Sequence, residues 1–123
     1  MRIVVTGSRD YPNEERVRQE LTDLFEDYYV ADIAQGGAAG ADEFARTWAN
    51  DQVSGSIYQT TCVTYEADWE VYGKAAGPRR NELMIDTFKP ELVLAFWDGK
   101  SKGTLHCLSY AVSKGIDVRI CAA

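Results

Sequence analysis

A glycine-rich segment, QGGAAGADEFA (residues 35–45), is the first pattern that could do chemistry. It places three glycines and four alanines between an apolar run and a helical pattern. Glycine lets backbone N–H groups come close to an anion, and the N-terminus of the following helix directs its positive end to the same place. The segment therefore predicts either a phosphate-binding loop or a tight strand-to-helix turn.

Basic side chains gather in the segments that follow the apolar runs. A guanidinium offers a planar fork of donors that matches a phosphate or a carboxylate, so the arginines are stronger candidates for anion binding than the lysines. The alternative for each cation is a solvated loop charge, and aspartates share the same segments. The basic residues are Arg9, Lys74, Arg79, Arg80, Lys100 and Lys102, and the aspartates are Asp10, Asp42, Asp68 and Asp98.

Two tryptophans, Trp69 and Trp97, stand where loops begin. Stacking on a nucleic-acid base is worth about 1–3 kcal/mol per base, although packing in the core is the favoured interpretation of each tryptophan.

Two phosphate-binding motifs are excluded. GKSKGT is not a P-loop because Leu94 stands where its first glycine belongs, and GGAAG lacks the GxGxxG spacing.

Length and charge limit the function classes. The chain has 123 residues, of which 46% are hydrophobic, and this predicts one domain over residues 1–123 with one substantial core. The net charge of −6 argues against wrapping of a nucleic-acid backbone, since such binding depends on many Lys and Arg contacts. No apolar run is long enough to cross a membrane, and we expect no membrane partner.

The N-terminus enters an apolar run at once, which leaves no room for an export signal and predicts a cytoplasmic protein. The three cysteines form no CxxC pair, a pattern that is typical of buried thiols in a reducing compartment. They are Cys62, Cys107 and Cys121. His106 is the single histidine and is adjacent to Cys107 on a predicted helix, where neighbours point in different directions. We therefore expect neither a metal site, nor a cofactor, nor a Cys-His catalytic pair.

Apolar runs alternate with helical patterns along the whole chain. Strands are predicted at residues 2–7, 30–35, 56–65, 91–97 and 116–121, and helices at 12–28, from 41 onward, at 78–88 and at 103–115. This alternation predicts an α/β fold, a single Rossmann-like domain with an about five-stranded parallel sheet and helices on both faces. Ligands bind such sheets at the carboxyl ends of the strands, where the glycines and charges described above fall.

Four segments together resemble a known family. Their order and spacing are similar to those of the YspA-type branch of the SLOG superfamily, which is named for SMF/DprA and the LOG proteins. The segments are VTGSRDY, QGGAAGADEFA, ADWEVYGKAAGPRRNELM and ELVLAFWDGKSKGT. The resemblance implies a Rossmann-like fold that binds nucleotides or nucleotide-derived ligands. LOG members hydrolyse the N-glycosidic bond of nucleoside monophosphates and pair as dimers, so a homodimer or larger homo-oligomer is allowed.

The resemblance carries over residue by residue to four motifs. Together with Trp69 and Arg79, the motif residues other than Met84 are the predicted ligand-binding set, for a ligand such as ADP-ribose or a nucleoside phosphate. The motifs comprise Gly7, Ser8 and Arg9; Gly36, Gly37, Gly40 and Asp42; Arg80, Asn81 and Met84; and Gly103 and Thr104.

Two departures from the family pattern bear on catalysis. Ala39 stands where the second motif often has arginine, and Cys107 stands where LOG hydrolases place a glutamate. A thiol replaces a carboxylate poorly when positive charge develops on a ribose, which favours a noncatalytic sensor or sequestering protein. The first alternative is a LOG-like N-glycosidase that uses Arg80 with Asp42, Glu43 or Asp98. DprA-like binding of single-stranded DNA is the weaker alternative.

Overall fold

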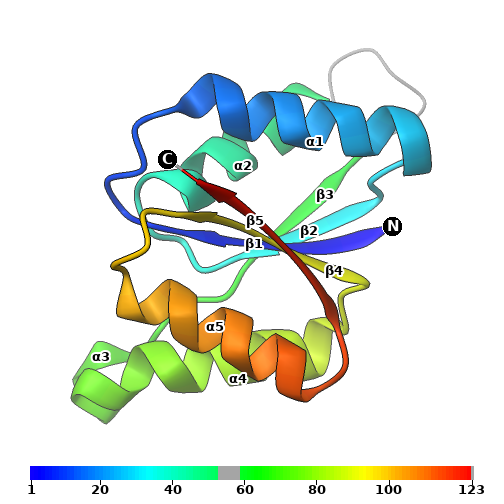
Figure 1. Cartoon of the computed structure of the whole chain (residues 1–123). Helices are drawn as coiled ribbons and strands as arrows, with labels where there is room; N and C mark the ends of the chain where they lie inside the picture. The colour runs from blue at the N-terminus through cyan, green and yellow to red at the C-terminus, as the bar shows by residue number, and fades with distance from the viewer. Residues whose placement is uncertain (53–58, 123) are drawn as a thin grey trace.

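Five parallel strands form the central sheet. They are β1 (Arg2–Gly7), β2 (Asp32–Gln35), β3 (Thr61–Thr64), β4 (Leu92–Trp97) and β5 (Asp117–Ala122), and they are arranged in the order β3-β2-β1-β4-β5. Figure 1 shows this arrangement in the computed structural model, which describes residues 1–52 and 59–122. The strands run away from the side where the N-terminus lies, so their carboxyl ends share one edge. The predicted fold class is confirmed.

Helices cover both faces of the sheet (Figure 1). On one face, α1 (Glu14–Tyr28) and α2 (Ala41–Asp51) pack against apolar residues that include Ile3, Val5 and Leu94. On the other, α4 (Ala76–Phe88) and α5 (Lys102–Ser113) pack against Val4, Ala34 and Val93. Side chains alternate across a strand, so β1 and β4 supply residues to both cores, which explains their continuous apolar sequence.

Several elements differ in extent from the sequence prediction, among them the following three. Within the described residues the third strand spans only Thr61–Thr64, and residues 56–58 of the predicted strand lie outside the described residues. A short helix, α3 (Trp69–Tyr72), and a 3₁₀ turn, η1 (Gly73–Ala75), were not predicted because α3 buries no side chain and so has no apolar periodicity. Helix α4 begins two residues before Pro78, since the first turn of a helix needs no N–H donor from proline.

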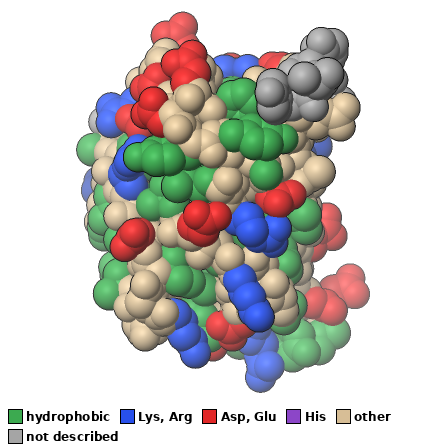
Figure 2. All heavy atoms as spheres, turned by 90° about the vertical axis from the view of Figure 1, so that its right-hand side faces the viewer, with side chains coloured by type: hydrophobic (Ala, Val, Ile, Leu, Met, Phe, Trp, Pro, Cys, Tyr) green, Lys and Arg blue, Asp and Glu red, His purple; other side chains and the backbone are tan. Residues whose placement is uncertain are grey.

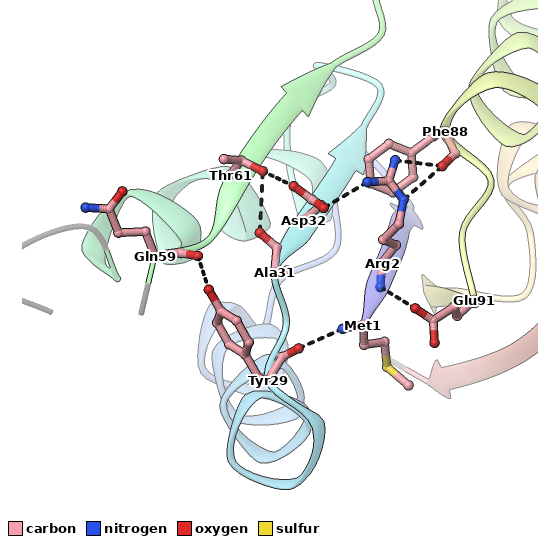
Figure 3. A network of polar contacts seen from close by, with 9 residues as sticks. All are labelled: Met1, Arg2, Tyr29, Ala31, Asp32, Gln59, Thr61, Phe88 and Glu91. Carbon is pink, nitrogen blue, oxygen red and sulfur yellow. Dashed lines mark hydrogen bonds and ion pairs between the residues drawn. The ribbon is translucent and has the colours of Figure 1, made fainter. Parts of the chain in front are cut away.

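The edge formed by the amino ends of the strands faces the viewer in Figure 2, where basic and acidic side chains lie side by side. Figure 3 shows how polar contacts connect three strands there. The N-terminal ammonium group donates to the Tyr29 carbonyl (2.8 Å), and the Tyr29 hydroxyl donates to the Gln59 carbonyl (2.8 Å). The Thr61 hydroxyl donates to Asp32 Oδ1.

Among the described residues, no helix has the length and apolarity needed to cross a bilayer.

Arg2 connects this edge to the end of α4 (Figure 3). Its Nε and Nη2 donate to the carbonyl oxygen of Phe88, the last residue of α4, at 3.1 and 2.7 Å, while Nη1 pairs with Asp32 Oδ2 at 2.8 Å. The carbonyls at a helix C-terminus carry partial negative charge and lack partners within the helix, so a guanidinium stabilises them. Arg2 therefore holds α4 from the edge opposite the one at which that helix begins.

We predict that Arg2→Met lowers the free energy of unfolding by about 1–2 kcal/mol, because the substitution removes the charged donors to Phe88 and Asp32 from a position that is still partly solvated. Urea unfolding should show a lower midpoint with an unchanged slope. Arg16→Met, which removes an exposed i,i+4 pair with Glu20 (3.1 Å), is the matched control and should lower the unfolding free energy by much less than Arg2→Met does. Equal losses in the two variants would contradict the capping role of Arg2.

Candidate functional site

A cavity of about 810 Å³ opens at the carboxyl edge of the sheet. The chain builds β2 and β3 on one side of β1 and then crosses to place β4 on the other, so the strand order reverses between β1 and β4. Parallel sheets bind ligands at such a reversal. The loops after β1, β2, β3 and β4 all contribute to the lining, which includes Gly7, Ser8, Arg9, Gly36, Gly37, Asp42, Trp69, Arg80, Asn81, Asp98, Gly103 and Thr104.

The glycine-rich loop after β2 is organised around a carboxylate of the chain itself. The N–H groups of Gly36 and Ala38 donate to Asp42 Oδ2 at 3.1 and 3.3 Å. The N–H of Gly37 donates to the side-chain oxygen of the buried Gln35 (2.5 Å). Three consecutive amides that could have bound a phosphate therefore already have partners, and the anion enclosed by this loop is Asp42.

Asp42 is an ionisable group in a poorly solvated place. The residue is 6% exposed, and burial raises the pKa of its carboxyl group to about 6, against the opposing effects of the Ala38 and Gly36 N–H groups and of the Arg80 guanidinium. Its Oδ1 is buried and has no hydrogen-bond partner within the described residues. Asp42 thus lines the cavity, and the protein leaves its Oδ1 unsatisfied.

Arg80, in the first turns of α4, joins the glycine-rich loop to the last loop. Its Nη1 donates to the Gly36 carbonyl (2.7 Å) and more weakly to the Tyr65 carbonyl (3.3 Å), while its Nε donates to Asn81 Oδ1 (2.9 Å). Asn81 in turn donates to the Gly103 carbonyl (3.2 Å) at the start of α5. Arg80 therefore supports the cavity wall, and only its Nη2 has no partner among the described residues.

Two glycines permit close backbone approach. A Cβ at Gly36 would overlap the Arg80 guanidinium, and Gly40 has a φ of 74° and lies so near the Ser8 and Arg9 carbonyls that a Cβ there would overlap them. The left-handed φ at Gly40 is strained for any residue with a side chain. Position 40 therefore requires glycine for the packing of the loops, and glycine at position 36 leaves room for the Arg80 guanidinium.

The loops after β1 and β4 are connected at the strand reversal. Ser8 is buried, its N–H donates to the Phe96 carbonyl (3.0 Å), and its hydroxyl accepts from the Asp98 N–H (3.2 Å). Asp98 Oδ1 accepts from the N–H groups of Lys100 and Ser101 (2.8 and 2.9 Å), and these bonds hold the pKa of Asp98 below its usual range. Asp98 thus shapes the turn that leads into α5.

The start of α5 remains open to an anion. Ser101 caps the helix by accepting from the Thr104 N–H (3.3 Å), while the N–H groups of Lys102 and Gly103 have no partner among the described residues. A Cβ built at Gly103 meets nothing within 4 Å, so the backbone there is accessible. Arg9, Lys74, Lys100 and Lys102 also line the cavity.

Several residues named from the sequence lie outside the cavity lining. The Arg79 guanidinium is over the Tyr72 ring (4.4 Å to the centroid), and Glu43 lies beside Arg46 on the exposed side of α2. Cys107 is fully buried in the core beneath α5, and this burial raises the pKa of its thiol to about 11. Trp69, 50% exposed, lines the cavity, whereas Trp97 does not and donates to the Ser101 carbonyl.

Among the lining residues that the sequence did not predict, two have ionisable side chains, His106 and Glu66. His106 Nε2 lies 3.4 Å from Glu82 Oε2, and its Nδ1 lies 3.5 Å from Asn81 Nδ2. A position three residues after Gly103, on the same side of α5, was the available signal for His106. Among the described residues, no group of three or more His, Cys, Asp or Glu side chains is placed to hold a metal ion.

Comparison with known proteins adds to this geometry. The model of the YspA, cpYpsA-related SLOG family matches residues 1–72, which include the loops after β1 and β2. The chain is also 37% identical over 118 residues to the Gene 61 protein of Mycobacterium phage D29, a match that covers 95% of this chain and 93% of the relative. The chain belongs to the YspA-related SLOG family.

The structure shows where the two residues that depart from the SLOG pattern, Ala39 and Cys107, lie. Ala39 leaves the glycine-rich loop without an arginine, and the loop amides are directed to Asp42. Cys107, which the resemblance predicts to stand in place of the LOG glutamate, packs in the core and does not line the cavity. The carboxylate of Asp42 is therefore the buried acidic group in the described lining.

We predict that Asp42→Asn changes the pH dependence of stability. The folded-state pKa of Asp42, about 6, lies above the ordinary value of 3.8 for this carboxyl group, so folding favours the neutral acid. Its stabilising effect is complete below pH 3.8 and is lost as the pH rises through 6. Between pH 4 and 7.5 the native protein should lose about 2–3 kcal/mol of unfolding free energy relative to the variant.

Urea unfolding of both proteins at several pH values measures this difference. Asp51→Asn makes the same charge change on an exposed side chain at the far end of α2 and controls for the general effect of removing a negative charge. Parallel stability profiles for the native protein and Asp42→Asn would show that the Asp42 carboxyl group is not perturbed.

Proposed function

We propose that the protein binds a nucleotide-derived, phosphorylated small molecule in the cavity at the carboxyl edge of the sheet, as a sensor or sequestering protein. The observation that carries this proposal is the convergence of four loops on one cavity at the point where the strand order reverses. Membership of the SLOG family supports a nucleotide-related role.

The phosphate is best accommodated at the start of α5. The N–H groups of Lys102 and Gly103, which have no partner in the described part of the chain, lie at the positive end of a helix of 12 residues. Lys100 and Arg9 add positive charge to the same cavity. The glycine-rich loop is less suitable, because its amides bind Asp42 and a phosphate there would meet a carboxylate. The phosphate site is therefore assigned to the side of the cavity nearest β4.

The ligand must be larger than a phosphate. A helix N-terminus contributes about 0.3–1 kcal/mol toward an anion and a charged hydrogen bond about 1.5–3 kcal/mol, so this side of the cavity provides roughly the 4 kcal/mol of millimolar binding. Micromolar binding needs about 8 kcal/mol. A volume of about 810 Å³ is within the range of cofactor-sized pockets, and Trp69 at its rim is exposed enough to stack on a base.

We expect AMP or ADP-ribose to raise the melting temperature more than inorganic phosphate does. Ligand at 100 times its dissociation constant adds about 2.7 kcal/mol to the unfolding free energy, which corresponds to several degrees for a domain of this size. Differential scanning fluorimetry with the three compounds at matched concentrations measures the effect. Equal shifts from phosphate and from the nucleotides would rule out recognition of more than the phosphate.

Arg9→Gln is the variant suited to this assay. Arg9 is exposed, lines the cavity and makes no hydrogen bond or ion pair within the described residues, so its loss should reduce the nucleotide-dependent shift without changing unliganded stability. Arg80→Ala is unsuitable, since it would also break the supports at Gly36 and Asn81. Arg119→Gln on β5, far from the lining, is the matched control.

Hydrolysis of the N-glycosidic bond is the alternative function, and we expect none. Asp98 uses one carboxylate oxygen to hold a turn, Glu43 lies outside the lining, and Cys107 is buried. Incubation with a panel of nucleoside monophosphates, followed by mass spectrometry, should detect no free base above a no-protein blank. Base release that disappears in Asp42→Asn but persists in Asp51→Asn would instead establish an enzyme that requires Asp42.

A further inference from the structure

The unsatisfied oxygen of Asp42 indicates which part of a ligand belongs beside it. Oδ2 is fixed by two loop N–H groups, so the carboxylate has one orientation and Oδ1 is left as the remaining acceptor. Leaving a buried acceptor unpaired costs about 1–3 kcal/mol, and more when it is charged. A donor from a ligand in the cavity would remove that cost, whereas an acceptor would increase it.

A cationic donor lies next to this acceptor. Gly36 joins the two groups, because its N–H donates to Asp42 Oδ2 and its carbonyl accepts from Arg80 Nη1. The Nη2 of Arg80 makes no hydrogen bond within the described residues, and both side chains line the cavity. This end of the cavity therefore presents a negatively charged acceptor beside a positively charged donor.

Few ligand groups fit both neighbours. A phosphate or carboxylate has only acceptors and would be repelled by Asp42, and an ammonium group has only donors and would be repelled by Arg80. A hydroxyl group is both a donor and an acceptor, so it can donate to Asp42 Oδ1 and accept from the guanidinium. A sugar is the part of a nucleotide that carries such groups.

We propose that Asp42 Oδ1 accepts a hydrogen bond from a ribose hydroxyl of the ligand, so that this end of the cavity selects ribonucleotides over deoxyribonucleotides. This inference rests on the proposed binding of a nucleotide. The phosphate side of the cavity, after β4, and the Asp42 side, after β2, lie on either side of β1. Two interstrand spacings separate them by about 10 Å, which a ribose phosphate with its hydrogen bonds spans.

The test compares the affinities of AMP, 2′-deoxy-AMP and 3′-deoxy-AMP by isothermal titration calorimetry. The native protein should bind AMP at least about 10-fold more tightly than one of the deoxy compounds, because a hydrogen bond to a charged group is lost. In Asp42→Asn the loop amides keep the side-chain oxygen, which leaves an NH₂ group facing the hydroxyl. The AMP preference should therefore fall toward one, and Asp51→Asn should keep it.

The outcomes distinguish a failure of the ribose site from a failure of the nucleotide binding on which it rests. Equal binding of all three compounds to the native protein would overturn the ribose site and leave nucleotide binding intact. A preference for AMP that persists in Asp42→Asn would overturn the assignment to Asp42. If none of the three compounds binds, the nucleotide proposal fails and the ribose site fails with it. The comparison on the native protein needs no variant, so it holds even if Asp42→Asn does not fold.

Discussion

The bonds from the loop amides to the Asp42 carboxylate determine how the rest of the site is arranged. They turn the glycine-rich loop inward, so that the loop encloses a charge of the protein instead of a ligand. They also hold that charge where water hardly reaches it, which makes ionisation unfavourable in the folded state. A protein selected for stability alone would place a neutral side chain here, and functional sites are where such local conflicts are expected.

Helix α4 connects the cavity to the opposite edge of the sheet through contacts at its two ends. At its start, Arg80 contacts the carbonyl of Gly36 and the side chain of Asn81. At its end, Arg2 binds the carbonyl of Phe88 and pairs with Asp32 on β2. The helix is thus fixed by an arginine near each end, one of its own and one from β1, and the cavity wall depends on contacts made at both edges of the sheet.

The fold could be predicted from the sequence because alternating apolar runs and helical patterns suffice to specify a parallel sheet with helices on both faces. The short helix α3 could not, since four residues with no buried side chain carry no periodic signal. The sequence also identified the loops that meet at the cavity. It did not indicate that Arg80 uses two of its nitrogens within the protein, or that Asp42 occupies the glycine-rich loop, because both depend on contacts between segments distant in sequence.

The close approach at Gly36 has a consequence for sequence variation. The guanidinium of Arg80 occupies the space that a Cβ at position 36 would need. A larger residue at 36 would displace the guanidinium from the Gly36 carbonyl, and loss of the arginine would open the space for such a residue. The two positions, 44 residues apart in the chain, are therefore under a joint selective constraint and should covary during evolution.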